Sequence, residues 1–139
     1  MNSMKHLPVL ALLLAAPLAY SQNHLGRWVT ETGNLEVQLE PCGDALCGKV
    51  VKVLANRSMS GPGTMEPADT RSPLGMTILS DLKPSGDGEW TGQIYNRENA
   101  KHYSVRMSTN TADQLVLRAY VGLPLFGKTQ VWRRAEAAQ

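Results

Sequence analysis

Most of the chain alternates apolar and polar residues with a period of two. Residues 35–40 read LEVQLE and residues 102–107 read HYSVRM, and residues 115–120 follow the same pattern less cleanly. Successive side chains of a β-strand point to opposite faces, so this period predicts antiparallel strands with one buried and one solvated face. The apolar members are expected to face inward; they are Leu35, Val37, Leu39, Ile94, Tyr103, Val105, Met107, Leu115 and Leu117.

Further strands are expected between clusters of turn-forming residues. These clusters contain Gly, Asn, Asp, Pro or Ser, and they lie at residues 32–34, 84–88, 96–101 and 110–113. About eight short strands with tight connections favour a closed, up-and-down antiparallel β-barrel, because closure removes exposed strand edges. A two-sheet sandwich is the alternative. The remaining expected strands span residues 27–31, 49–54, 76–82, 90–95 and 129–134.

The N-terminal stretch departs from this period and has the pattern of a secretory leader. Basic residues open it, an apolar stretch over residues 7–20 follows, and Ala19 and Ser21 stand at the −3 and −1 positions of a cleavage site. The apolar stretch is shorter than the roughly 20 residues of a membrane span. No cysteine follows within cleavage distance, which argues against a lipid anchor. We therefore expect a signal peptide over residues 1–21 and an exported, periplasmic domain over residues 22–139 with no transmembrane anchor.

Composition narrows the class of protein further. The chain has 139 residues, with 14 Lys and Arg against 12 Asp and Glu, which gives a formal net charge of +2. Because the basic residues are scattered and balanced, the sequence excludes a strong electrostatic binder of nucleic acid. The apolar content of 42% excludes a disordered chain.

The two cysteines bracket a turn. Cys42 and Cys47 stand on either side of Gly43 and Asp44, between two expected strands. In an oxidising compartment this arrangement predicts a structural disulfide, which would contribute roughly 2 kcal/mol by closing a short loop. A redox pair is the alternative, but four residues separate the cysteines instead of two, and no helix follows to lower a thiol pKa.

The first and last expected strands resemble those of lipocalin-type barrels. Gly26 and Trp28 match the Gly-x-Trp motif that opens such barrels, and Trp132 and Arg134 share one face of the last strand. In that superfamily a tryptophan of the first strand packs under an arginine of the last strand. The resemblance therefore implies that Arg134 lies over Trp28 and closes one end of the barrel, with Trp132 beside them.

The chain more specifically resembles the exported bacterial family called domain of unknown function 2147. The family implies a lipocalin-like barrel in the periplasm and, by analogy, binding of a small ligand; it implies no established reaction. The chain departs from the family pattern in turns, at Asn96-Arg97 and Ala100, and also at Ala119. The matching motifs are Gly26-x-Trp28, Pro41-Cys42-Gly43, Leu46-Cys47-Gly48, Pro73-Leu74-Gly75, Trp90-x-Gly92-x-Ile94-Tyr95, Lys101-x-Tyr103, Leu117-Arg118-x-Tyr120-x-Gly122 and Phe126-Gly127-x-Thr129-Gln130-x-Trp132-x-Arg134.

Motifs for catalysis or metal binding are missing from the sequence. His24 and His102 have no Cys, Asp or Glu at ligand spacing, so no metal site is expected. Neither a Gly-x-Ser-x-Gly elbow nor a phosphate-binding loop occurs. Glu36 and Glu40 share a strand face, and we expect them on the solvated outer face instead of in a paired-carboxylate site. The sequence therefore predicts no enzyme and no cofactor.

Candidate ligand-binding residues are polar or adaptable side chains on the strands of the barrel. Arg118 and Tyr120 share a strand face and are either polar anchors in a cavity or an exterior pair. The full set of candidates is Tyr95, Tyr103, Met107, Arg118 and Tyr120.

Two loops are unusual. Residues 55–72 form a long connection with the adaptable side chains Met59 and Met65, and this connection is either a lid over a barrel mouth or an irregular surface loop. Residues 122–127 are unusually apolar and contain the single Phe. We expect them to plug one end of the barrel; an exposed docking patch is the alternative.

These features predict a periplasmic binding protein that holds a small apolar or amphipathic ligand in its barrel. The alternative is a protein-interaction module of the cell envelope, with a filled barrel that acts through its surface loops. An eight-stranded barrel suits either function, because such barrels are either packed solid or hold one small ligand.

Overall fold

The computed structural model describes residue 8 and residues 24–135. The signal peptide predicted for residues 1–21 falls, apart from residue 8, outside the described residues and stays a prediction.

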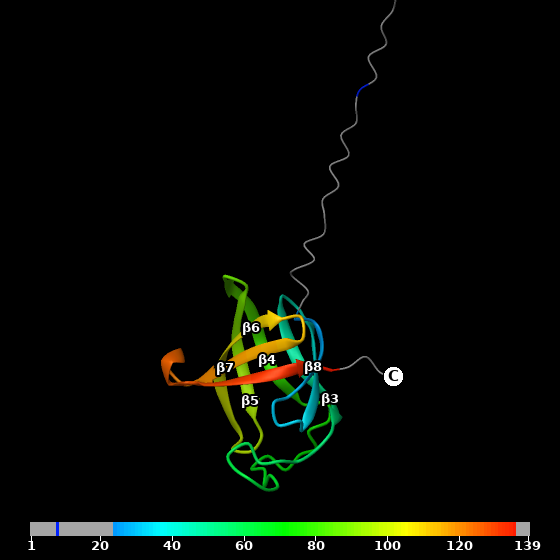
Figure 1. Ribbon diagram of the computed structural model, residues 1–139, viewed down its shortest axis with the longest axis vertical. Helices are drawn as coiled ribbons and strands as arrows, with labels where there is room; N and C mark the ends of the chain where they lie inside the picture. The colour runs from blue at the N-terminus through cyan, green and yellow to red at the C-terminus, as the bar shows by residue number, and fades with distance from the viewer. Residues whose placement is uncertain (1–7, 9–23, 136–139) are drawn as a thin grey trace, which may run out of the picture.

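Eight antiparallel strands form one closed barrel in which each strand pairs with the next (Figure 1). The first and last strands complete the circle, with Trp28 opposite Arg134 and Val29 opposite Arg133. The predicted up-and-down barrel is confirmed, and the sandwich alternative is excluded. The strands are β1 (Gly26–Val29), β2 (Leu35–Cys42), β3 (Ala45–Val53), β4 (Thr77–Gly86), β5 (Glu89–Asn96), β6 (Lys101–Thr111), β7 (Gln114–Tyr120) and β8 (Lys128–Arg134).

Several strands run further than the sequence pattern predicts. β4 continues through Pro84 to Gly86, into a segment expected to be a turn. The reversal uses only Asp87 and Gly88, which both have positive φ angles of 54° and 73°. A two-residue turn of this kind matches the twist of the flanking strands, so the pairing extends almost to the tip of the hairpin.

The barrel interior holds the core that the alternation predicts. Every residue expected to face inward is buried except Tyr103, which is half-buried. Glu36 and Glu40 lie on the outer face, where they contact Arg27 and Lys49 at 3.5 Å. The side chains that are less than 2% exposed are Trp28, Val37, Leu39, Val50, Leu79, Leu82, Val105, Met107, Leu115, Leu117 and Trp132.

One end of the barrel is sealed by the contact that the lipocalin resemblance implies. The guanidinium carbon of Arg134 lies 4.2 Å from the centroid of the Trp28 ring. Arg134 also donates hydrogen bonds to the backbone carbonyls of Leu25 (3.0 Å) and Ala112 (2.7 Å). Beneath it, the indole N–H of Trp28 donates to the carbonyl of His24 at 2.9 Å. One arginine therefore ties the start of the barrel to the β6–β7 turn.

The predicted disulfide between Cys42 and Cys47 is present at the same end. It spans the β2–β3 hairpin, in which Cys42 pairs with Ala45 and Gly43 has a φ of 66°. In an up-and-down barrel the β2–β3, β4–β5 and β6–β7 turns all lie at one end. The four other connections therefore lie at the opposite end, where the candidate site is found.

Candidate functional site

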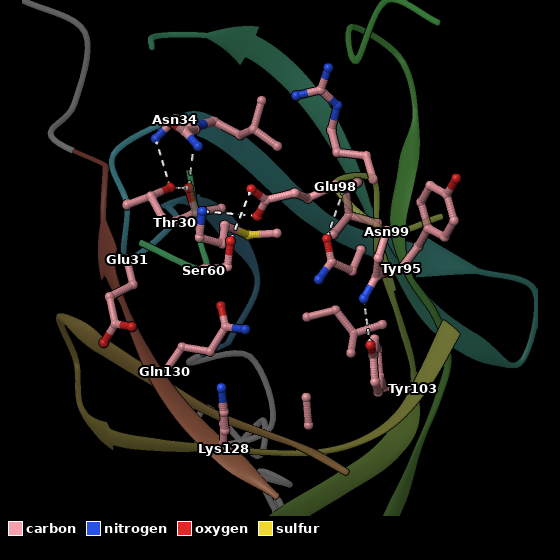
Figure 2. Close-up of a pocket in the computed structure, with 18 of the residues that line it drawn as sticks. Thr30, Glu31, Asn34, Ser60, Tyr95, Glu98, Asn99, Tyr103, Lys128 and Gln130 are labelled. Carbon is pink, nitrogen blue, oxygen red and sulfur yellow. Dashed lines mark hydrogen bonds between the residues drawn. The ribbon is translucent and has the colours of Figure 1, made fainter. Parts of the chain in front are cut away.

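The end of the barrel opposite Arg134 contains a cavity of about 730 Å³ (Figure 2). The residues around it come from the β1–β2, β3–β4, β5–β6 and β7–β8 connections and from the adjoining ends of the strands. Its mouth is lined by polar side chains together with Met59, Val121 and Phe126, and its floor consists of side chains of the barrel core. The apolar side chains of the floor are Leu35, Ile78, Ile94, Ala119 and Trp132.

The long β3–β4 connection, residues 54–76, crosses this end of the barrel and is called the lid below (Figure 1, green). Its first anchor is Asn34, which is 3% exposed. The Asn34 amide accepts a hydrogen bond from the Arg57 N–H (2.7 Å) and donates one to the Arg57 carbonyl (2.8 Å). The Asn34 carbonyl also accepts hydrogen bonds from the N–H groups of Leu54 and Ala55. The structure therefore favours the lid over an irregular surface loop.

A second anchor comes from the β5–β6 turn. One oxygen of Glu98 accepts a hydrogen bond from the Ser58 hydroxyl (2.7 Å), and the other accepts one from the Met59 N–H (2.9 Å). The Ser58 hydroxyl, followed by the Met59 N–H, lowers the pKa of Glu98, because both donors stabilise the charged form. Next to it, Arg97 donates to the sulfur of Met65, a residue of the lid that is only 4% exposed.

A third anchor lies on the outer wall of the barrel. Asp69 accepts hydrogen bonds from Arg71 (2.6 and 2.9 Å) and from the hydroxyl of Tyr95 (2.5 Å). These bonds, first of all those from Arg71, hold the pKa of Asp69 well below its usual range, and the bond to Asp69 raises the pKa of Tyr95. Tyr95 borders the cavity, but it follows the inward-facing Ile94 and packs beside His102, and its ring points away from the cavity centre (Figure 2). In the structure, Tyr95 fastens the lid.

The other candidate residues occupy different places. Tyr103 faces the cavity, and its hydroxyl accepts a hydrogen bond from Asn99 at 2.7 Å. Met107 is fully buried in the core, outside the cavity lining. Arg118 lies on the outer face of β7, where it binds carbonyls of the β7–β8 hairpin at 2.6 and 3.2 Å. Tyr120 borders the cavity but shares the outer face of β7 with Arg118.

The prediction that residues 122–127 plug the barrel is wrong. Leu123, Leu125 and Phe126 are 62%, 77% and 76% exposed. The short 3₁₀ turn η2 (Pro124–Phe126) projects from the barrel at the left of Figure 1. The physical reason is the guanidinium of Arg118, which binds two carbonyls of this segment and holds it at the rim, where Phe126 borders the cavity, instead of across the mouth.

Two cavity residues that the sequence reasoning missed lie on β8. Lys128 pairs with Ala119 and Gln130 pairs with Leu117, so both side chains share the inward face with Trp132. The period of two along the last strand could have identified both residues, because it already places Trp132 and Arg134 on one face. Two further steps of the same period reach Gln130 and Lys128, although the expected strand began one residue too late to include Lys128.

The fold and the cavity define the class as a lipocalin-like β-barrel. The chain is similar in structure to protein HP1028 from Helicobacter pylori, described as belonging to the lipocalin family, with a TM-score of 0.62 and 21% sequence identity. The match covers 81% of this chain and 82% of that one. A model of the family described as an uncharacterised protein conserved in bacteria, DUF2147, matches residues 26–134. The chain belongs to this family.

No curated protein matches the chain by sequence. Within residues 24–135, no helix is long and apolar enough to cross a membrane.

Proposed function

We propose that this protein is a non-enzymatic binding protein that holds a small apolar or amphipathic molecule in its barrel. The observation that carries the proposal is the cavity of about 730 Å³, which has an apolar floor, a mouth with several polar side chains and an anchored lid. Pockets for small molecules usually measure about 300–1,000 Å³ and combine an apolar lining with a few polar groups. Ligand binding is also the role that the lipocalin-like fold suggests.

The periplasm is the compartment that we propose. The leader pattern of residues 1–21 supports it. The disulfide between Cys42 and Cys47 supports it independently, because disulfides persist in oxidising compartments.

Filling the cavity tests the proposed function. The neutral fluorescent probe N-phenyl-1-naphthylamine is expected to bind the purified protein, with its emission increased by the apolar surroundings. Ala119→Phe places a large side chain in the cavity, because Ala119 lines it from β7. This variant should bind the probe at least about tenfold more weakly, a loss of roughly 1.4 kcal/mol.

The matched control is Val116→Phe, on the outer face of the same strand, where the sequence alternates with the inward Leu115 and Leu117. It should leave probe affinity unchanged, while thermal unfolding shows whether either variant has lost its fold. A wild-type protein that fails to bind the probe would contradict the proposal, as would equal binding by a folded Ala119→Phe variant.

A second candidate function is interaction through the β7–β8 hairpin. Four large apolar side chains there are at least 62% exposed, and an exposed cluster of this kind commonly marks a contact surface. A photo-crosslinker placed at Phe126 should give one discrete adduct in cells, and Leu125→Ser should weaken it. A crosslinker at Lys83, exposed on β4, is the control. Equal adducts from both positions would argue against this function.

A further inference from the structure

Most hydrogen-bond acceptors around the cavity mouth already have partners within the protein. The side-chain oxygen of Asn34 accepts from Arg57, and both oxygens of Glu98 accept from the lid. The side-chain oxygen of Gln130 accepts a hydrogen bond from the indole N–H of Trp132 at 2.8 Å. Each of these oxygens therefore already accepts at least one hydrogen bond within the protein.

The donors remain available. Because the oxygen of Gln130 is bound to Trp132, its NH₂ group is left to donate into the cavity. The hydroxyl oxygen of Tyr103 accepts from Asn99, so its own O–H is free to donate. The ammonium group of Lys128 adds three donors and a positive charge, and it points toward Gln130 and the cavity centre (Figure 2).

The small side chain of Ala119 lies between these donors. Ala119 on β7 pairs with Lys128 on one side and with Val105 on the other, and Tyr103 is two residues further along the same face of β6. Lys128 thus lies directly beside a strand position that has almost no side chain, and Tyr103 lies diagonally across from it. The space above Ala119 is accessible from both neighbouring strands.

Two cations and two carboxylates line the cavity, and both carboxylates already accept hydrogen bonds from the protein. Lys128 forms no ion pair within the described part of the chain. Glu31 is an exposed carboxylate at the rim. It accepts a hydrogen bond at 3.2 Å from the N–H of Val131, which is on the same strand as Lys128. Glu98 is occupied by the lid, as described above. Across the mouth, Arg97 contributes a second cation to the lining, and its Nε is buried without a hydrogen-bond partner.

We propose that the cavity takes an amphiphile with an anionic head group, such as a carboxylate or a phosphate ester. Lys128, the NH₂ of Gln130 and the hydroxyl of Tyr103 bind the head group, and the apolar body lies on the floor of the cavity. This inference rests on the proposed function. The floor residues in question are Leu35, Ile78 and Ile94.

Displacement of N-phenyl-1-naphthylamine by ligands with one common apolar body tests the inference. Dodecanoate, dodecyl phosphate and 1-dodecanol are compared at low ionic strength, below the concentrations at which they aggregate. We expect at least one anion to bind about tenfold more tightly than the alcohol, because charge-assisted hydrogen bonds are stronger than neutral ones. The two anions distinguish a carboxylate site from a phosphate site.

Two variants test whether Lys128 and Gln130 cause the preference for an anionic head group. Lys128→Met should remove it, as should Gln130→Glu, which keeps an acceptor for Trp132 but replaces the donor with a carboxylate. Lys83→Met, on the β4–β5 side of the sealed end, makes the same change in net charge and should keep the preference.

Equal affinities of the wild-type protein for all three ligands would overturn the inference while leaving the proposed function standing. A preference that survives in Lys128→Met would overturn it too. Failure of both the probe and the alcohol to bind would overturn the proposed function itself.

Discussion

Replacing Arg134 with alanine is expected to lower the free energy of unfolding by about 2–3 kcal/mol. The substitution removes a cation–π contact of 4.2 Å with a fully buried tryptophan. It also removes charged hydrogen bonds to the carbonyls of Leu25 and Ala112. Since Trp28 and Arg134 form one of the two residue pairs that join β1 to β8, the closure of the barrel depends on this side chain. Urea unfolding followed by tryptophan fluorescence measures the loss.

The neighbouring arginine is the control for that prediction. Arg133 pairs with Val29 in the same closure, but its side chain is exposed on the opposite face of β8. Arg133→Ala should therefore change the free energy of unfolding by less than about 0.5 kcal/mol. If both alanine variants lost the same stability, the seal would not depend on Arg134.

Asn34→Ala is expected to detach the lid and to cost about 2 kcal/mol of stability. The substitution leaves the N–H and the carbonyl of Arg57 without the partners that now bind them at 2.7 and 2.8 Å. Trypsin provides the measurement, because Arg57 is itself a cleavage site within the lid. We expect cleavage after Arg57 to become faster in the variant than in the wild-type protein.

Asn110→Ala is the matched control for the lid. Asn110 is exposed on β6 at the sealed end, and its amide makes a single long contact of 3.5 Å with Gln114. Its replacement should change neither the stability nor the cleavage after Arg57. An Asn34→Ala protein that trypsin cut at the wild-type rate would show that the other two anchors hold the lid without Asn34.

The fold could be predicted from the sequence because a strand with one buried face repeats its pattern every two residues. Leu35, Val37 and Leu39 show this directly, since all of them are buried. Strand ends were less predictable. Pro84 marks a turn in the sequence, yet β4 continues past it, because the reversal needs only Asp87 and Gly88.

The site was less predictable, because polarity alone does not say which face of a strand a residue occupies. Tyr95 and Arg118 were interpreted as ligand anchors, but Tyr95 follows the inward Ile94 and Arg118 follows the inward Leu117. Strict use of the period places Arg118 outside and would have pointed to Gln130. Tyr95 follows an inward residue but still borders the cavity.

The contacts that anchor the lid could not be predicted from the sequence, because they join residues far apart in the chain. Asn34 and Arg57 are 23 positions apart, and Ser58 and Glu98 are 40 apart. No local pattern of the sequence indicates such a pairing.

The sealed end has a practical consequence for how this protein is handled. The described chain both starts and finishes there: the His24 carbonyl accepts from Trp28, and the Ala135 N–H donates to the Arg27 carbonyl. A sensor chip, resin or fluorescent fusion attached through either of these ends is therefore separated from the cavity by the length of the barrel. An immobilised molecule would present its mouth to the solution, so surface-based binding measurements can use the protein without shielding the site.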